Sequence, residues 1–114
     1  MRLKEGKRSK NNSQLVKLGK YILDANHATL KNQDHSEKML TAREAKILEL
    51  LAVNKNEVVR RDAVLSRFWD VENKDYFASR SLDVFIKKIR TAIEDEPSVE
   101  LRTIRGVGFK LIVE

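Results

Sequence analysis

Apolar residues between positions 79 and 93 recur every three or four residues, which predicts a helix with one buried face. The buried stripe would consist of Leu82, Ile86, Ile89 and Ile93. The opposite face would present Ser81, Val84, Phe85 and Lys88. A helix held by one face, with polar, apolar and cationic side chains on the other, is suited to enter a grooved polyanion. Double-stranded DNA is the first candidate.

Two further helices are predicted upstream. Thr41-Ala-Arg-Glu44 matches a capping box, in which the threonine and glutamate side chains each satisfy an unpaired backbone amide, so we expect a helix to begin there. An apolar face follows, and the polar residues 54–56 end the helix. Helical spacing of apolar residues then marks a second short helix over 61–69.

The ends of the third helix follow from local residue types. The polar residues 70–78 predict a loop, with Tyr76 and Phe77 holding it against the body of the domain. Ser79 is suited to cap the helix, and Pro97 requires it to stop before Glu96. The third helix is therefore expected over about residues 79–94.

Short apolar segments separated by turn residues predict up to four antiparallel strands over residues 14–40. Residues 58–59 are expected to form a short extended connection. A terminal hairpin is predicted over 99–113, with both glycines of Gly106-Val-Gly108 at positive φ. Leu101 and Ile104 break the alternation of its first strand, which predicts a bulge or a change of pairing. The fold class is therefore α+β.

Composition limits the chemistry. The 114 residues suffice for one domain with one core. No cysteine is present, which excludes disulfides and thiolate metal sites, and the polar segment 34–37 around His35 favours an exposed turn over a metal site. We expect no cofactor and no metal. No apolar run approaches the roughly 20 residues that cross a bilayer, so we expect a soluble, cytoplasmic protein.

The net charge of +6 is unevenly distributed. Residues 1–12 hold five Lys or Arg and one Glu, and therefore +4 of the total. This segment has no apolar periodicity, so residues 1–13 are predicted to be a disordered basic tail or an interdomain linker, and residues 14–114 the folded domain. Because the net charge of the folded domain is small, its basic residues point to a partner only where they cluster on the surface.

Four motifs in this order resemble the winged-helix output domain of OmpR/PhoB-type response regulators, over about residues 14–114. They are LTARE at 40–44, VVRRDAVLSRFW at 58–69, SRSLDVFIKKIR at 79–90 and TIRGVGF at 103–109. The resemblance implies an N-terminal β-sheet, three helices with the third in the major groove of DNA, and a hairpin wing at the neighbouring minor groove. It also implies a role in two-component regulation of transcription.

The resemblance assigns roles to individual residues. The expected base contacts are Ser81, Val84, Phe85, Lys88 and, in the minor groove, Arg105. The expected phosphate contacts are Arg80, Lys87, Arg90 and Thr103. Phe85 has an equally good interpretation as core or rim packing. Three positions depart from the family pattern: Arg60 stands where the family often has a capping Ser or Thr, Lys88 where arginine is common, and Phe85 where a polar or imidazole side chain is frequent.

The resemblance also implies partners. A receiver domain would precede this domain in a longer parent chain, with residues 1–12 as the remainder of a linker, although a protein without a receiver is the alternative. The loop over 70–78 would meet RNA polymerase. Two copies bound to tandem half-sites, as a dimer on the DNA, are compatible with this family.

Three other functions compete with DNA binding. A winged-helix protein-interaction module that does not bind nucleic acid is the main alternative, and the 70–78 loop favours it. Duplex RNA is disfavoured because a helix does not fit its deep, narrow major groove. An enzyme is disfavoured because the scattered Ser, His and Asp residues do not form a nucleophile with an oriented base.

Overall fold

A computed structural model describes residues 15–69 and 76–114, with the side chains of the last helix described from Ala78 onward. The predicted tail over 1–13 and residues 70–75 of the predicted loop lie outside the described residues. The elements are β1 (Leu15–Leu18), β2 (Tyr21–Asp24), β3 (Thr29–Asn32), β4 (Glu37–Met39), α2 (Ala42–Val53), β5 (Val58–Arg60), α3 (Arg61–Phe68), α4 (Tyr76–Ile93), β6 (Val99–Ile104) and β7 (Gly108–Val113).

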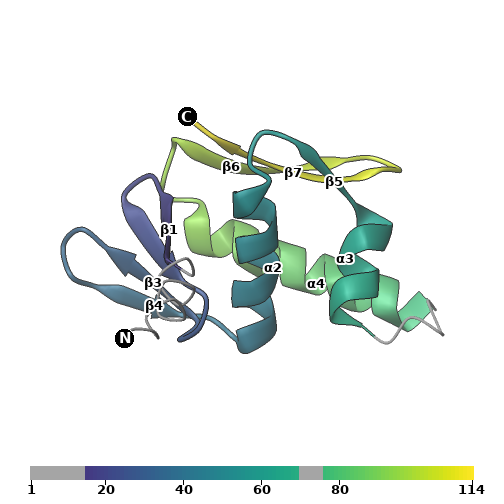
Figure 1. The fold of residues 1–114 in the computed structure, drawn as a ribbon, viewed down its shortest axis with the longest axis horizontal. Coiled ribbons are helices and arrows are strands. Elements are labelled where there is room, and N and C mark those ends of the chain that lie inside the picture. Colours follow the sequence, from purple (N-terminus) through teal and green to yellow (C-terminus); the bar gives the residue numbers. More distant parts are fainter. Residues whose placement is uncertain (1–14, 70–75) are drawn as a thin grey trace, which may run out of the picture.

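The first four strands form an antiparallel sheet in the order β1-β2-β3-β4, as the spacing of the short apolar segments predicts. Side chains alternate across it, because Tyr21 and Leu23 are buried while Ile22 between them is 45% exposed. The sheet lies at one end of the molecule, and α2 crosses in front of α4 beside it (Figure 1). Its inner face therefore completes one end of the core.

Helix α2 begins where the capping box predicts. The Thr41 hydroxyl oxygen accepts a hydrogen bond from the Glu44 amide at 3.1 Å, and the Thr41 amide donates to Glu44 Oε1 at 2.8 Å. Helix α3 has no such cap, because Arg60 stands at its N-cap and makes no capping hydrogen bond with its side chain. Among the described residues, α2, α3 and α4 are the three helices that the sequence predicts.

Helix α4 begins at Tyr76, three residues before the predicted start at Ser79. Ser79 is not a cap, since its hydroxyl and carbonyl oxygens both accept hydrogen bonds from Arg61 Nη2, at 2.7 and 2.8 Å. Ala78 is buried and extends the apolar stripe by one turn, four residues before Leu82. Residues 76–78 therefore belong to the helix, and the prediction that they form a loop is wrong.

The C-terminal hairpin is part of a three-stranded sheet in the order β5-β7-β6. Residues 58–59, expected to be only an extended connection, belong to β5, which pairs with β7. Pairing of β6 with β7 runs without interruption from Val99 opposite Val113 to Ile104 opposite Gly108, so the predicted bulge is absent. Ile104 instead ends the strand on the face opposite Leu101.

The two glycines of the hairpin have different reasons to be glycine. Gly106 has φ of +75°, as predicted for the turn. Gly108 lies in β7 and is not at positive φ, so that part of the prediction is wrong. A Cβ on Gly108 would lie 2.0 Å from the Val59 carbonyl oxygen, so glycine is needed for the close approach of β5.

A polar network joins the four-stranded sheet to the end of α4. The Tyr21 hydroxyl donates to Asp95 at 2.8 Å, and Lys38 Nζ donates to the Ala92 carbonyl at 2.7 Å and to Asp95 at 3.4 Å. The Tyr21 hydroxyl, followed by Lys38, holds the pKa of Asp95 below its ordinary value. The network therefore fixes where α4 ends relative to the sheet.

We expect Asp95→Asn to reduce the acid dependence of stability. A lowered pKa in the folded chain means that the ionised carboxylate stabilises the fold above the ordinary carboxyl pKa of about 4, and that this contribution is lost as the pH falls below it. Urea unfolding from about pH 7 to about pH 3 measures the effect. The variant should lose less stability than the wild type over the acid limb. Glu94→Gln, which removes an exposed carboxylate one residue earlier, is the matched control, and equal acid limbs in Asp95→Asn and wild type would contradict the expectation.

Candidate nucleic-acid interface

The exposed face of α4 forms one continuous stripe. Val84 is 53% exposed, and with Lys87, Lys88 and Thr91 it lines a shallow hollow on the surface of the helix. These positions differ by three, four and seven residues, so they share one face, opposite the buried residues Leu82, Ile86 and Ile89. Arg80, one turn earlier, is also exposed. Thr91 is not among the predicted contacts, although its spacing from Val84 and Lys87 places it on the same face.

Phe85 lies at the border of this stripe. It is half-buried and packs against the core, with its ring edge-to-face with Trp69 at a centroid distance of 5.7 Å. Rim packing, one of the two interpretations of Phe85, is therefore what its contacts show, and a base contact stays a prediction. Ser81, also half-buried, lies on the same side of the helix.

Asp83, the acidic residue of this part of α4, is paired with Arg61 of α3. Arg61 Nη2 donates to Asp83 Oδ1 at 2.9 Å and to the two oxygens of Ser79. The same guanidinium lies 5.8 Å from the centre of the Phe109 ring. Arg61 therefore joins α3, α4 and β7, and it leaves the cations of the α4 stripe without a competing free carboxylate at Asp83.

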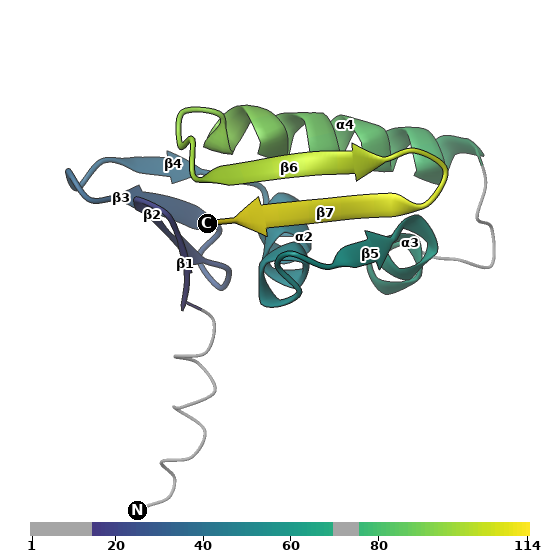
Figure 2. The same cartoon turned by 90° about the horizontal axis from the view of Figure 1, so that it is seen from above.

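Arg90 and Thr103, two of the predicted phosphate contacts, are joined by a hydrogen bond. Arg90 Nε donates to the Leu101 carbonyl at 3.1 Å, and Arg90 Nη2 donates to the Thr103 hydroxyl at 2.9 Å. Both residues remain exposed. Strand β6 runs alongside α4 (Figure 2), and these bonds fix the hairpin relative to the helix.

Arg105 is exposed in the turn of the hairpin, next to Gly106. The turn is closed by a hydrogen bond from the Val107 amide to the Ile104 carbonyl at 2.9 Å. It lies at the same end of the molecule as the start of α4 (Figures 1 and 2). The hairpin turn that carries Arg105 and the first turns of α4, which carry Arg80, therefore lie at the same end of the molecule.

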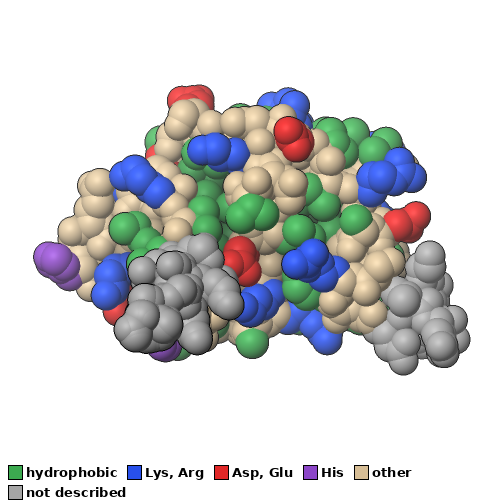
Figure 3. All heavy atoms as spheres, viewed as in Figure 1, with side chains coloured by type: hydrophobic (Ala, Val, Ile, Leu, Met, Phe, Trp, Pro, Cys, Tyr) green, Lys and Arg blue, Asp and Glu red, His purple; other side chains and the backbone are tan. Residues whose placement is uncertain are grey.

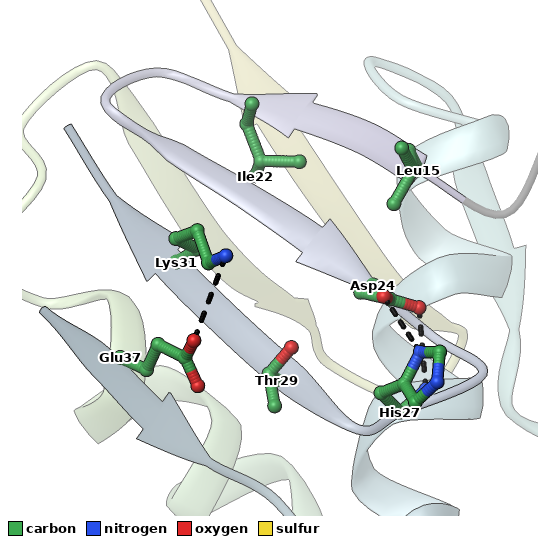
Figure 4. A pocket seen from close by; sticks show the side chains of 7 residues that line it. All are labelled: Leu15, Ile22, Asp24, His27, Thr29, Lys31 and Glu37. Carbon is green, nitrogen blue, oxygen red and sulfur yellow. Dashed lines mark hydrogen bonds and ion pairs between the residues drawn. The ribbon is translucent and has the colours of Figure 1, made fainter. Parts of the chain in front are cut away.

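The outer face of the four-stranded sheet holds a second shallow pocket (Figure 4). Its polar side chains pair with one another, because His27 Nδ1 lies 2.8 Å from Asp24 Oδ2 and Lys31 Nζ lies 3.6 Å from Glu37 Oε2. Residues 34–36 form an exposed turn in which Asp34 accepts hydrogen bonds from Ser36, and Glu37 begins β4. Within the described ranges there is no group of three or more residues able to hold a metal ion, and no helix long and apolar enough to span a bilayer.

Comparisons with known proteins give one family. The profile of the family described as "Transcriptional regulatory protein, C terminal" matches residues 35–111. The transcriptional regulatory protein RprY of Bacteroides fragilis is 38% identical over 112 residues, which cover 98% of this chain and 46% of RprY. The chain thus spans about half the length of this curated relative.

Solved structures give the same fold. The response regulator DrrB of Thermotoga maritima, an OmpR/PhoB homologue, superposes with a TM-score of 0.72 at 33% identity, over 96% of this chain and 50% of DrrB. The RstA DNA-binding domain of Klebsiella pneumoniae, solved in complex with the RstA box, superposes with a TM-score of 0.65 at 22% identity, over 87% of this chain and 97% of that domain. At 22% identity, the similarity to the RstA domain supports the fold alone.

Proposed function

The chain belongs to the family of C-terminal domains of transcriptional regulatory proteins, of the OmpR/PhoB type, and on this premise we propose that it binds double-stranded DNA sequence-specifically as the output domain of a response regulator. The observation that carries the proposal is the exposed stripe of α4 with a hairpin fixed beside it by Arg90. A neighbour of the same winged-helix fold was solved on its DNA, which supports this use of the fold.

In the proposed complex, α4 lies in the major groove. Lys88 donates to guanine O6 and N7, and the methyl groups of Val84 meet a thymine methyl. Ser81 borders this base-reading face, and Arg105 enters the minor groove, where narrow A·T-rich tracts attract a cation. The phosphate contacts are Arg80, Lys87, Arg90 and Thr103. Because Arg90 and Thr103 are bonded to each other, they would bind one phosphate together.

The other proposed partners follow from the family. A receiver domain in a longer parent chain would carry an acidic phosphorylation pocket. Residues 70–78 would contact RNA polymerase, and two copies would occupy tandem half-sites.

Selection from a randomised duplex library, with sequencing of the retained DNA, tests the proposal. The proposal predicts enrichment of a defined motif and an affinity that falls steeply with salt. A matched RNA duplex should not compete. Absence of enrichment even at low salt would contradict DNA binding and favour the protein-interaction module.

A further inference from the structure

One exposed arginine outside α4 and the hairpin is held by two aromatic rings. The guanidinium carbon of Arg43, in the first turn of α2, lies 4.5 Å from the centre of the Trp69 ring and 5.8 Å from that of Phe85. Both distances are within the range of cation–π attraction. The two rings pack edge-to-face against each other. Arg43 is therefore held at the meeting point of α2, the end of α3 and α4.

This guanidinium keeps its hydrogen-bonding capacity. Arg43 is exposed, and within the described parts of the chain its interactions are the two ring contacts, with no carboxylate paired to it. Stacking leaves the planar guanidinium free to donate from its edge. Arg61 differs, because its guanidinium is used by Ser79 and Asp83.

The surroundings of Arg43 favour an anion. A shallow hollow beside it is lined by two further cations, Lys46 and Arg67, and by Phe68 and Phe85. Lys46 Nζ also lies 4.0 Å from Glu49 Oε1, which leaves Arg67 and Arg43 as the cations of the hollow without a carboxylate partner among the described residues. Lys and Arg side chains gather at the lower edge of the face in Figure 3, beneath α2 and α3 as they run in Figure 1. Phe85 borders the exposed stripe of α4, so an anion bound by that stripe passes close to Arg43.

We propose that Arg43 is an additional phosphate-binding residue and that Phe85, with Trp69, is a positioning residue that holds its guanidinium toward the DNA backbone. The inference rests on the proposed function, because the phosphate belongs to the duplex bound by α4. It reassigns Phe85 from reading a base to orienting a cation. It also adds to the interface a contact from α2, on the side of α4 opposite the hairpin.

The test uses the whole 114-residue chain and a fluorescein-labelled duplex enriched from the randomised library. Binding is measured by anisotropy as a function of salt. Arg43→Gln should lower the slope of log K against log salt by about 1, as expected for one lost phosphate contact. Lys31→Gln, which removes a cation from the distant outer face of the sheet, should leave the slope unchanged. An unchanged slope for Arg43→Gln, while Lys88→Ala and Arg105→Ala weaken binding, would overturn the inference and leave the proposed function standing.

A double-mutant cycle tests the role of Phe85. Phe85→Leu should weaken binding by about two- to fivefold when Arg43 is present, which corresponds to one exposed cation–π contact, and should have no further effect together with Arg43→Gln. Phe85→Tyr, which keeps the ring, should bind like the wild type. Thermal melting confirms that each variant is folded. Equal losses for Phe85→Leu in both backgrounds would overturn the positioning role, and failure of the wild type to bind any duplex would overturn this inference together with the proposed function.

Discussion

Gly108→Ala is expected to lower the free energy of unfolding by about 3 kcal/mol, at the upper end of the usual cost of overpacking. The added Cβ would lie 2.0 Å from the Val59 carbonyl oxygen and 2.8 Å from Arg60 Cα, and both neighbours are backbone atoms that no side-chain rotation can move. Strand β5 must therefore separate from β7, with loss of their pairing. Since Arg60 leads directly into α3, the shift also changes how α3 supports α4.

Gly106→Ala is the matched control, because it makes the same chemical change two residues earlier. No atom lies within 4 Å of a Cβ at Gly106, so its cost is the left-handed backbone conformation alone, about 1 kcal/mol. Urea unfolding of both variants measures the difference. Equal stability of Gly108→Ala and the wild type would show that β5 does not approach β7 as described.

Lys88→Ala is expected to cost about 1 to 3 kcal/mol of binding to the selected duplex and to relax the preference at one base pair. Lys88 lies near the middle of the exposed stripe, between Val84 and Thr91, where a major-groove contact reads a base edge. Because the side chain is exposed, its removal should leave the stability of the fold unchanged.

Lys87→Ala is the control for this prediction, as it removes the same charge from the adjacent position. Lys87 is proposed to bind phosphate, so its loss should weaken binding to all duplexes about equally and reduce the salt slope by about 1. Sequencing of duplexes selected by each variant separates the two effects. The roles would be wrong if both variants selected the wild-type motif with equal sharpness.

The sequence predicts well those features of the fold that depend on residues close together in the chain. Capping of α2 depends on four consecutive residues, and the buried stripe of α4 depends on spacing within one helix, so both are visible without knowledge of the tertiary structure. The predicted start of α4 is three residues too late because Ser79 has the residue type of a helix cap. In the fold its two oxygens instead accept hydrogen bonds from Arg61, eighteen residues earlier.

The other features that the sequence does not predict depend on contacts between segments far apart in the chain. Strand β5 has only three residues, and its pairing partner β7 lies about fifty residues later, so no local pattern reveals it. For Phe85 the sequence leaves rim packing and a base contact open, and the contacts that favour rim packing, the Trp69 ring and the Arg43 guanidinium, come from the end of α3 and from α2. No sequence pattern marks Arg43, because Trp69 and Phe85 come close to it only in the fold.

The location of the bound duplex is the most direct test of DNA binding through α4 and the hairpin. Backbone amide chemical shifts of the ¹⁵N-labelled chain, followed as the selected duplex is added, report contacts along the chain. DNA binding by α4 and the hairpin predicts that shift changes concentrate in residues 80–91 of α4, residues 103–107 of the hairpin and the first turn of α2, while the outer face of β1–β4 stays unchanged. Changes confined to the four-stranded sheet, with α4 and the hairpin unaffected, would contradict it.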